Sequence, residues 1–213
     1  MLPAYLLVLI IQLWLKSTIS KYSKIMTKFS GASSADLVLQ TAGVTNVGIG
    51  RVNGELTDNY DPSSQIIYLS NSVISSNSIT AVGVAAHEAG HAIQYHEDYG
   101  PARLRQATVK VCNIGSRLAI PLIFLGAILS FEPLEIAGIV CFMLVVAFQL
   151  ITLPVEFNAS NRAVKILSGS GYFTNEEITG VKRVLTAAAM TYVGSLAVST
   201  MQLLYYVSRI KRR

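Results

Sequence analysis

Hydrophobic residues are concentrated in four long stretches of this 213-residue chain. These stretches cover residues 2–15, 118–130, 136–153 and 184–207. A helix needs about 20 apolar residues to cross a bilayer, so the first two stretches are short for a span and the last two come close to that length or exceed it. The pattern predicts an N-terminal membrane anchor, a transmembrane helical hairpin and a C-terminal apolar helix.

Charged residues favour one orientation of these stretches. The turn at 131–135 contains two glutamates and no basic residue, whereas the first stretch is followed by Lys16, Lys21, Lys24 and Lys28. Because cytoplasmic loops are enriched in Lys and Arg, we expect the N-terminus outside and the residues after the anchor in the cytoplasm. Four crossings would leave the basic residues at 209–213 outside, so the side of the C-terminus stays open.

The polar half of the chain predicts shorter elements. Residues 33–40 form a helical pattern capped by Ser33 or Ser34 and stopped near Gly43. Residues 44–52 and 65–69 are typical of strands and would pair as a small hairpin. A further helix is expected over 78–94. The predicted fold class is therefore mainly α (α+β), a helical membrane bundle with a small β-hairpin.

Composition supports a membrane protein and argues against a nucleic-acid partner. Hydrophobic residues make up 52% of the chain and charged residues only 14%, and the mean hydropathy is +0.48. A soluble domain carries about a quarter charged residues, so much of the surface must face the lipid bilayer. The net charge of +5 does not form a dense basic stripe with aromatic residues. Cys112 and Cys141 are expected to be free buried thiols.

The predicted helix at 78–94 contains the pattern His-Glu-x-x-His. His87 and His91 are four residues apart, so their imidazole rings lie on one face of a helix and can bind one metal ion. Glu88 would flank that ion, where a carboxylate can take a proton from a metal-bound water and pass it to a leaving amine. The motif therefore predicts a zinc site that hydrolyses peptide bonds.

A catalytic zinc ion needs a third protein ligand. The extended motif with Gly at 94 and His at 97 is excluded, because the chain has Gln94 and Glu97 there. His96 lies about 140° around the helix from His91 and is interpreted as a surface residue. Glu156 is the better candidate, although from spacing alone it could equally be an acidic residue at the start of a new helix after Pro154. The weaker candidates are Glu97, Asp98, Glu132 and Glu135.

Three motifs together resemble a known family. These are GELTDNYDP at 54–62, AAHEAGHAIQ at 85–94 and LPVEFNAS at 153–160. In this order, and behind an apolar anchor, they resemble the bacterial membrane-bound neutral zinc metallopeptidases called YugP-like. The third motif is also similar to a segment of HtpX-type and CAAX-prenyl membrane proteases, which are zincins with a glutamate ligand.

The resemblance implies a zincin-like membrane metallopeptidase of the gluzincin type. It implies that His87, His91 and Glu156 bind one Zn²⁺ ion per chain and that Glu88 is the catalytic base. A single membrane-embedded peptidase domain over 1–213 would then comprise an anchor (2–15), a cytoplasmic zincin part (16–115), a transmembrane hairpin (116–153), a third-ligand segment (154–183) and a C-terminal helix (184–207).

One position departs from the pattern of the HtpX-type relatives. They have Asp four residues after the ligand glutamate, where it orients a zinc histidine, and this chain has Ser160. A hydroxyl orients a zinc histidine less firmly than a carboxylate does. Asp58 or Asp61 would then take over this role, unless both only cap their own loop.

The predicted function is that of a multi-pass membrane zinc endopeptidase with polypeptide substrates and an active site on the cytoplasmic side. An extended substrate could pair with the strand at 65–69, and Tyr60, Tyr172 or Arg162 could stabilise the oxyanion. The alternative is an inactive zinc-binding adaptor or chaperone-like protein. A transporter is disfavoured, because no ionisable residue lies in the middle of an apolar stretch.

Overall fold

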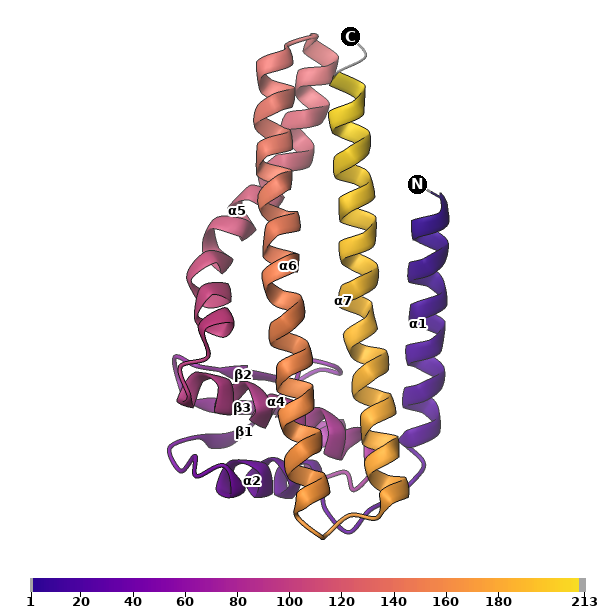
Figure 1. Ribbon diagram of the computed structural model, residues 1–213, viewed down its shortest axis with the longest axis vertical. Coiled ribbons are helices and arrows are strands. Elements are labelled where there is room, and N and C mark those ends of the chain that lie inside the picture. Colours follow the sequence, from indigo (N-terminus) through magenta and orange to yellow (C-terminus); the bar gives the residue numbers. More distant parts are fainter. Residues whose placement is uncertain (1, 211–213) are drawn as a thin grey trace. The chain divides into compact units, whose positions relative to one another are not determined.

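The computed structural model describes residues 2–210 and is mainly helical with one small sheet, which confirms the predicted fold class (Figure 1). Lys211, Arg212 and Arg213, whose side of the membrane was left open, lie outside the described residues. The elements are α1 (Leu2–Tyr22), α2 (Gly31–Thr41), β1 (Gly48–Val52), β2 (Asn59–Asp61), β3 (Ile66–Ser70), α3 (Asn71–Ile74), α4 (Ile79–His96), α5 (Gly100–Leu129), α6 (Glu132–Gly169) and α7 (Asn175–Ile210).

The described chain divides into two compact units. The helical unit contains residues up to 11, 100–154 and 191 onward, and the mixed unit contains 12–99 and 155–190. Helices α1, α6 and α7 each continue from one unit into the other along the chain. The assignment of the whole chain to one peptidase domain stays a prediction.

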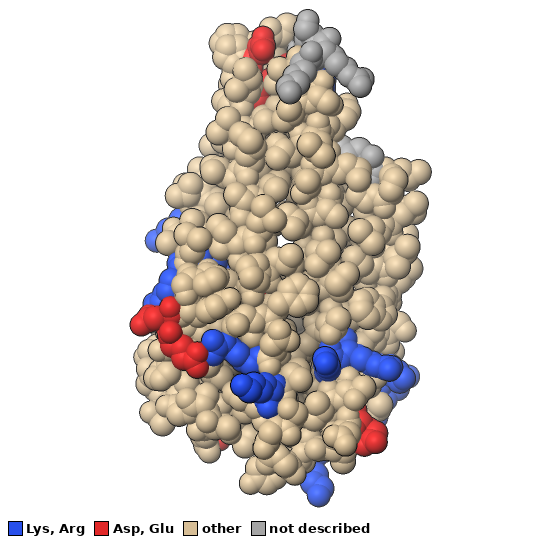
Figure 2. Space-filling view, viewed as in Figure 1, with Lys and Arg blue, Asp and Glu red and all other residues tan. Residues whose placement is uncertain are grey.

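The helical unit contains most of the four apolar stretches. Helices α1, α5, α6 and α7 are long and apolar enough to cross a membrane, as the four hydrophobic stretches predicted. Large apolar side chains on them are exposed, among them Phe124 at 67% and Ile128 at 63%. On the face drawn in Figure 2, the apolar parts of α6 and α7 present a surface almost without charged side chains. Such a surface is suited to lipid.

Helices α5 and α6 form the predicted hairpin. Gly126 and Gly138 allow their backbones to approach closely, because a Cβ at either position would overlap Glu135 or Ile123 of the other helix. The chain reverses at Ser130, which has a positive φ of 51°.

The predicted break at Pro154 is wrong. Helix α6 continues through this proline as far as Gly169, so Glu156 lies inside a long helix and not at the start of a new one. A proline inside a helix costs about 3 kcal/mol. Val155 and Ala159, which follow it, are both fully buried, and their burial offsets much of that cost.

Helix α2 shows how the polar half of the chain forms its elements. Its N-cap is Ser30 and not Ser33 or Ser34, because Ser30 and Ser33 bond each other's backbone N–H in a capping box. Gly43 follows the helix with φ of +72°, in the left-handed conformation that favours glycine.

The sheet differs from the predicted hairpin. Its order is β1-β3-β2, with β1 parallel and β2 antiparallel to β3. Residues 44–52 and 65–69 therefore do not pair as a hairpin, because the chain between them first forms β2 and then returns as β3 between the two outer strands. The prediction that an extended substrate pairs with the strand at 65–69 is also wrong, since both edges of β3 are already paired.

Helix α4 lies at the centre of the mixed unit. It packs against α2 and the sheet, and its N-cap Ser78 bonds the backbone N–H of Ala81, as a helix over 78–94 requires. Small side chains such as Ala85 and Ala89 are fully buried in this core. Because these side chains are small, the rest of this core can pack close to that side of α4.

Candidate metal centre

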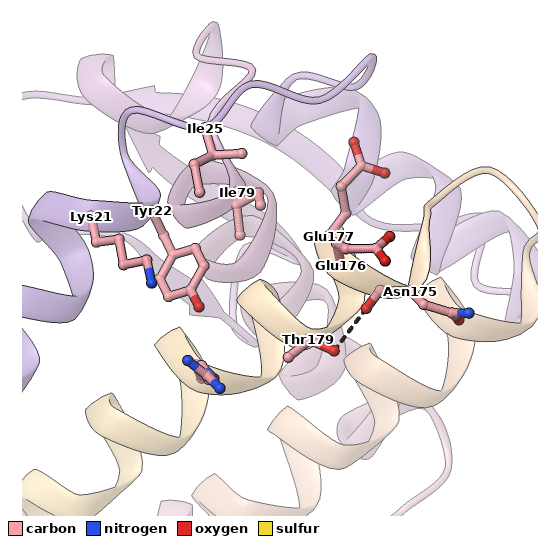
Figure 3. Close-up of a pocket in the computed structure, with 9 residues that line it drawn as sticks. Lys21, Tyr22, Ile25, Ile79, Asn175, Glu176, Glu177 and Thr179 are labelled. Atoms are coloured by element: carbon pink, nitrogen blue, oxygen red, sulfur yellow. Dashed lines mark hydrogen bonds between the residues drawn. The ribbon is translucent and has the colours of Figure 1, made fainter.

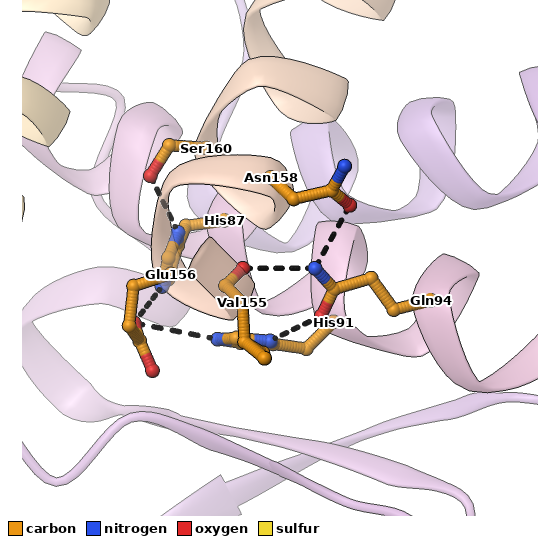
Figure 4. Close-up of polar contacts among 7 residues, drawn as sticks. All are labelled: His87, His91, Gln94, Val155, Glu156, Asn158 and Ser160. Carbon is orange, nitrogen blue, oxygen red and sulfur yellow. Dashed lines mark hydrogen bonds and ion pairs between the residues drawn. The ribbon is translucent and has the colours of Figure 1, made fainter. Parts of the chain in front are cut away.

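The two histidines of the motif lie on one face of α4, as predicted. The ring centroids of His87 and His91 are 4.6 Å apart at an interplanar angle of 77°. Helical geometry produces this arrangement, because residues i and i+4 are neighbours on a helix surface. Their Nε2 atoms point towards the same residue of α6 (Figure 4).

Gly90 allows α6 to reach this face. A Cβ at Gly90 would overlap the backbone carbonyl of Ala159, so the two helices touch backbone to backbone at this point. The contact places the residues on either side of Ala159 against the motif. Glycine in a helix interior costs about 1 kcal/mol relative to alanine, and here that cost allows the close approach.

Glu156 completes a group of three ligand side chains. Its Oε2 atom lies 3.3 Å from Nε2 of His87 and 3.6 Å from Nε2 of His91. One ligand atom from each residue lies within 4.8 Å of the others, and within residues 2–210 this is the group of His, Cys, Asp and Glu side chains that could hold one ion. Two imidazole nitrogens and a carboxylate oxygen are a ligand set that zinc prefers, with a fourth position for water.

The electrostatics of the group favour positive charge. Burial by itself lowers the pKa of His91, but the hydrogen bond to Glu156 and the charges of Glu88 and Glu156 outweigh it, so the pKa of His91 is raised. The side chain of Glu156 is only 3% exposed. A buried carboxylate needs a cation or strong donors beside it, and a divalent ion between the three residues meets that need.

Ser160, four residues after Glu156, contacts the motif. Its hydroxyl is 3.1 Å from Nδ1 of His87. Asp58 and Asp61 do not take over this role, because Asp58 accepts from the backbone N–H and hydroxyl of Ser70 and Asp61 accepts from the backbone of Ser63. Asp61 thus caps its own loop, as the alternative predicted, whereas Asp58 instead bonds Ser70 at the end of β3.

Gln94 contacts the candidate centre although the sequence did not predict a role for it. This residue is fully buried, and its side chain lies 3.0 Å from Nδ1 of His91. The available signal was its spacing, since a residue three positions after His91 lies on the same helix face. The contact depends on α6, which no local pattern could place.

The other candidates lie apart from the group. His96 is exposed at the end of α4, as predicted, and Glu97 forms an ion pair with Arg162 at 2.6 Å. Tyr60 packs against the ring of Tyr95. Arg162 is thus engaged with the C-cap residue of α4.

A pocket of about 380 Å³ elsewhere in the mixed unit has a different character (Figure 3). Basic and acidic side chains both line it, including Lys21, Arg183 and Glu176. Among the described residues that line it there is no histidine or cysteine, so the pocket does not offer a zinc site. Cys112 and Cys141 are free thiols, as expected, but only Cys112 is buried and Cys141 is half-buried.

Comparison with known proteins agrees with this geometry. Residues 1–211 match the family described as "Putative neutral zinc metallopeptidase". The chain is 44% identical over 200 residues to a Bacillus subtilis (strain 168) protein named "Putative membrane protease YugP", across 92% of this chain and 88% of that protein. No solved structure matches the chain. Zinc is the cofactor that this family implies, and the chain belongs to the neutral zinc metallopeptidase family.

Proposed function

We propose that this membrane protein is a zinc-dependent endopeptidase of the gluzincin type. The observation that carries the proposal is the convergence of His87, His91 and Glu156 from two helices, with ligand atoms within 4.8 Å of one another. These three residues would hold the ion. When bound, zinc would polarise the scissile carbonyl group and lower the pKa of a water molecule.

Glu88 is the general base of the proposed reaction. It follows His87 directly on α4 and is 9% exposed, so its carboxylate is largely shielded from solvent. It takes a proton from the attacking water and delivers it to the nitrogen of the leaving amine. An inactive zinc-binding adaptor would have no need for a carboxylate at this position, which is why Glu88 favours the enzyme.

The experiment that tests the reaction compares the purified full-length protein with Glu88→Gln. Unfolded casein is the substrate, because its sequence is varied and its backbone is accessible. We expect zinc binding by both proteins and a loss of at least about 100-fold in cleavage by Glu88→Gln, the range typical of general-base removal. Equal cleavage by both proteins would refute the role of Glu88 as general base. Zinc binding without cleavage by either protein would favour the adaptor.

The third ligand has its own test. Glu156→Ala removes the carboxylate that faces both histidines, so the zinc content of the purified protein should fall well below one ion per chain. The matched control is Glu97→Ala, which removes an exposed carboxylate of α4. Unchanged zinc content in Glu156→Ala would refute the assignment.

The active site is proposed to face the cytoplasm, with the apolar helices crossing the cell membrane. Basic residues of the mixed unit lie beside the apolar stretches of α1, α6 and α7, namely Lys16, Lys21, Lys24, Lys28, Lys165, Lys182 and Arg183. Such residues are enriched on the cytoplasmic side. In a cysteine-free background, Ser64→Cys should be protected from an impermeant thiol reagent in whole cells and Glu132→Cys should be labelled. The reverse result would place the site outside.

A further inference from the structure

A chain of hydrogen bonds through two amide side chains leads from the half-buried Arg162 to the buried His91. Gln94 has no exposed surface, and Nε2 of its amide lies 2.8 Å from the backbone oxygen of Val155 and 2.9 Å from Oδ1 of Asn158 (Figure 4). Its Oε1 lies 3.0 Å from Nδ1 of His91. Leaving a buried amide without partners costs about 1–3 kcal/mol, so these contacts are what makes a glutamine acceptable in this core.

Arg162 sets the direction of the hydrogen bonds. A guanidinium group only donates, and its Nε donates to Oδ1 of Asn158 at 2.7 Å while Nη1 donates to Glu97 at 2.6 Å. The Asn158 atom that faces Gln94 is therefore the carbonyl oxygen. Like the backbone carbonyl of Val155, it only accepts, so the group of Gln94 that faces these two oxygens must be the NH₂ group.

The orientation of the amide decides the proton position on His91. With NH₂ directed at two acceptors, the carbonyl oxygen of Gln94 faces Nδ1, and a carbonyl oxygen can only accept. Nδ1 must then carry the proton, and the lone pair is left on Nε2, which is 3.6 Å from Glu156. We propose that Gln94 is a positioning residue that holds His91 in this tautomer, and that Asn158 and Arg162 fix the orientation of its amide.

This proposal rests on the proposed metal centre, because it concerns the nitrogen that His91 offers to the ion. A neutral imidazole ring has two tautomers, and the one with its proton on Nε2 cannot bind a metal through that atom. A partner that accepts only from Nδ1 removes this tautomer and fixes the ring. Partners of this kind change metal affinity or activity by about 10- to 100-fold.

Two variants separate positioning from packing. Gln94→Met keeps the length of the side chain and removes its hydrogen bonds, whereas Gln94→Glu keeps an oxygen that accepts from Nδ1. We expect Gln94→Met to bind Zn²⁺ about 10- to 100-fold more weakly in competition with a chelator, and Gln94→Glu to retain more of the affinity. If Gln94 only filled space, the apolar methionine would be tolerated at least as well as a buried carboxylate. Ile93→Met, a change at the neighbouring buried residue, is the control for packing.

A spectroscopic measurement reports the tautomer without an activity assay. The chain contains three histidines, so ¹⁵N-histidine NMR of the labelled protein in detergent resolves few signals, and His96→Asn assigns the exposed one. With and without Zn²⁺, His91 should show a protonated Nδ1 in the wild type and in Gln94→Glu. In metal-free Gln94→Met the signals should shift towards a mixture of tautomers. Arg162→Met, which removes the donor that fixes Asn158, should shift them less.

The outcomes distinguish this proposal from the proposed function. The positioning role is overturned if Gln94→Met folds and shows wild-type zinc affinity and an unchanged His91 tautomer. If Gln94→Met does not fold, an unchanged tautomer in Arg162→Met overturns it. A wild-type protein that binds zinc and cleaves no peptide would refute the peptidase and leave the positioning result intact. A wild-type protein that binds no zinc would remove the metal centre, while a His91 tautomer insensitive to Gln94→Met would still overturn the positioning role.

Discussion

The surroundings of His87 and His91 differ in kind, although the two residues are one helical turn apart on α4. His91 has a side chain that is 9% exposed and faces an amide whose direction is set by a permanent cation. His87 has a side chain that is 17% exposed and faces the hydroxyl of Ser160, which can either donate or accept. The His91 side of the candidate centre is therefore buried with a fixed hydrogen-bond partner, and the His87 side is half-buried with a partner that can donate or accept.

This difference indicates different roles for the two histidines in the proposed zinc site. In the proposed zinc site, His91 with its single tautomer would keep the position of the ion constant, whereas His87, held by a hydroxyl, would be free to adjust when a substrate approaches. Both halves depend on the same contact between α4 and α6, and the following changes are ordered by their expected effect on zinc affinity.

Gly90→Ala should have the largest effect on zinc affinity, because it disturbs the surroundings of both histidines at once. The added Cβ would overlap the carbonyl of Ala159, and the resulting displacement of α6 would move the partners of both histidines together. Overpacking of this kind costs about 1–3 kcal/mol in stability, and we expect a zinc affinity at least about 100-fold lower as ligands and their partners are lost together. Metal analysis and circular dichroism of the purified protein check this.

Gly83→Ala is the matched control for Gly90→Ala. It lies on the same helix, and its Cβ would meet Val181 at 3.6 Å, an ordinary contact. Because alanine is about 1 kcal/mol better than glycine in a helix, zinc binding should be unchanged and stability the same or higher. Equal zinc loss in both variants would show that α4 tolerates no change, and the role of the close approach would be rejected.

Substitutions of Ser160 should change the zinc affinity less, and they can lower or raise it. Ser160→Ala removes a partner that does not fix the tautomer of His87, so the zinc affinity should fall only a few-fold, less than in Gln94→Met. Ser160→Asp supplies an oxygen that only accepts, and we expect an increase of up to about tenfold. Competition with a chelator measures both. If Ser160→Ala weakens binding as much as Gln94→Met, the two halves do not differ as proposed.

The parts of the site that could be predicted from the sequence are those with local spacing. His87, Glu88 and His91 follow from helical periodicity and from Ser78 as N-cap. Glu156 followed from the resemblance of its motif, while its spacing alone left the assignment open. Gln94 could not be found this way, because its partner Val155 is 61 positions away and is brought close only by the packing of α6 at Gly90.

The fold shows the same limit. The four apolar stretches and the helix at 78–94 were predictable, because hydrophobic patterning and capping are local. The parallel pairing of β1 and β3 was missed because it depends on β2, a strand of three residues with little pattern of its own. The continuation of α6 through Pro154 was missed because tertiary burial outweighed the local preference of proline.

Glu97→Gln tests the far end of the amide chain and should have a small effect. The side chain of Glu97 is 52% exposed, so its ion pair with Arg162 contributes at most about 1 kcal/mol. Arg162 retains its bond to Asn158 in this variant, and we expect zinc affinity to change less than about twofold. A loss of zinc affinity as large as that of Gln94→Met would mean that Glu97, and not the guanidinium of Arg162, fixes the orientation of the Asn158 and Gln94 amides.

Asp58→Ala should leave zinc affinity unchanged, because its carboxylate accepts from the backbone N–H and hydroxyl of Ser70 rather than from a histidine. Loss of these hydrogen bonds should lower the free energy of unfolding by about 1–2 kcal/mol, since the N–H of Ser70 is left without its acceptor. Thermal unfolding monitored beside chelator competition separates the two effects. Asp61→Ala, whose carboxylate accepts from Ser63 in an exposed turn, is the control. Weaker zinc binding in Asp58→Ala but not in Asp61→Ala would mean that Asp58 helps to hold His87. The surroundings of His87 would then be as fixed as those of His91, contrary to their contacts.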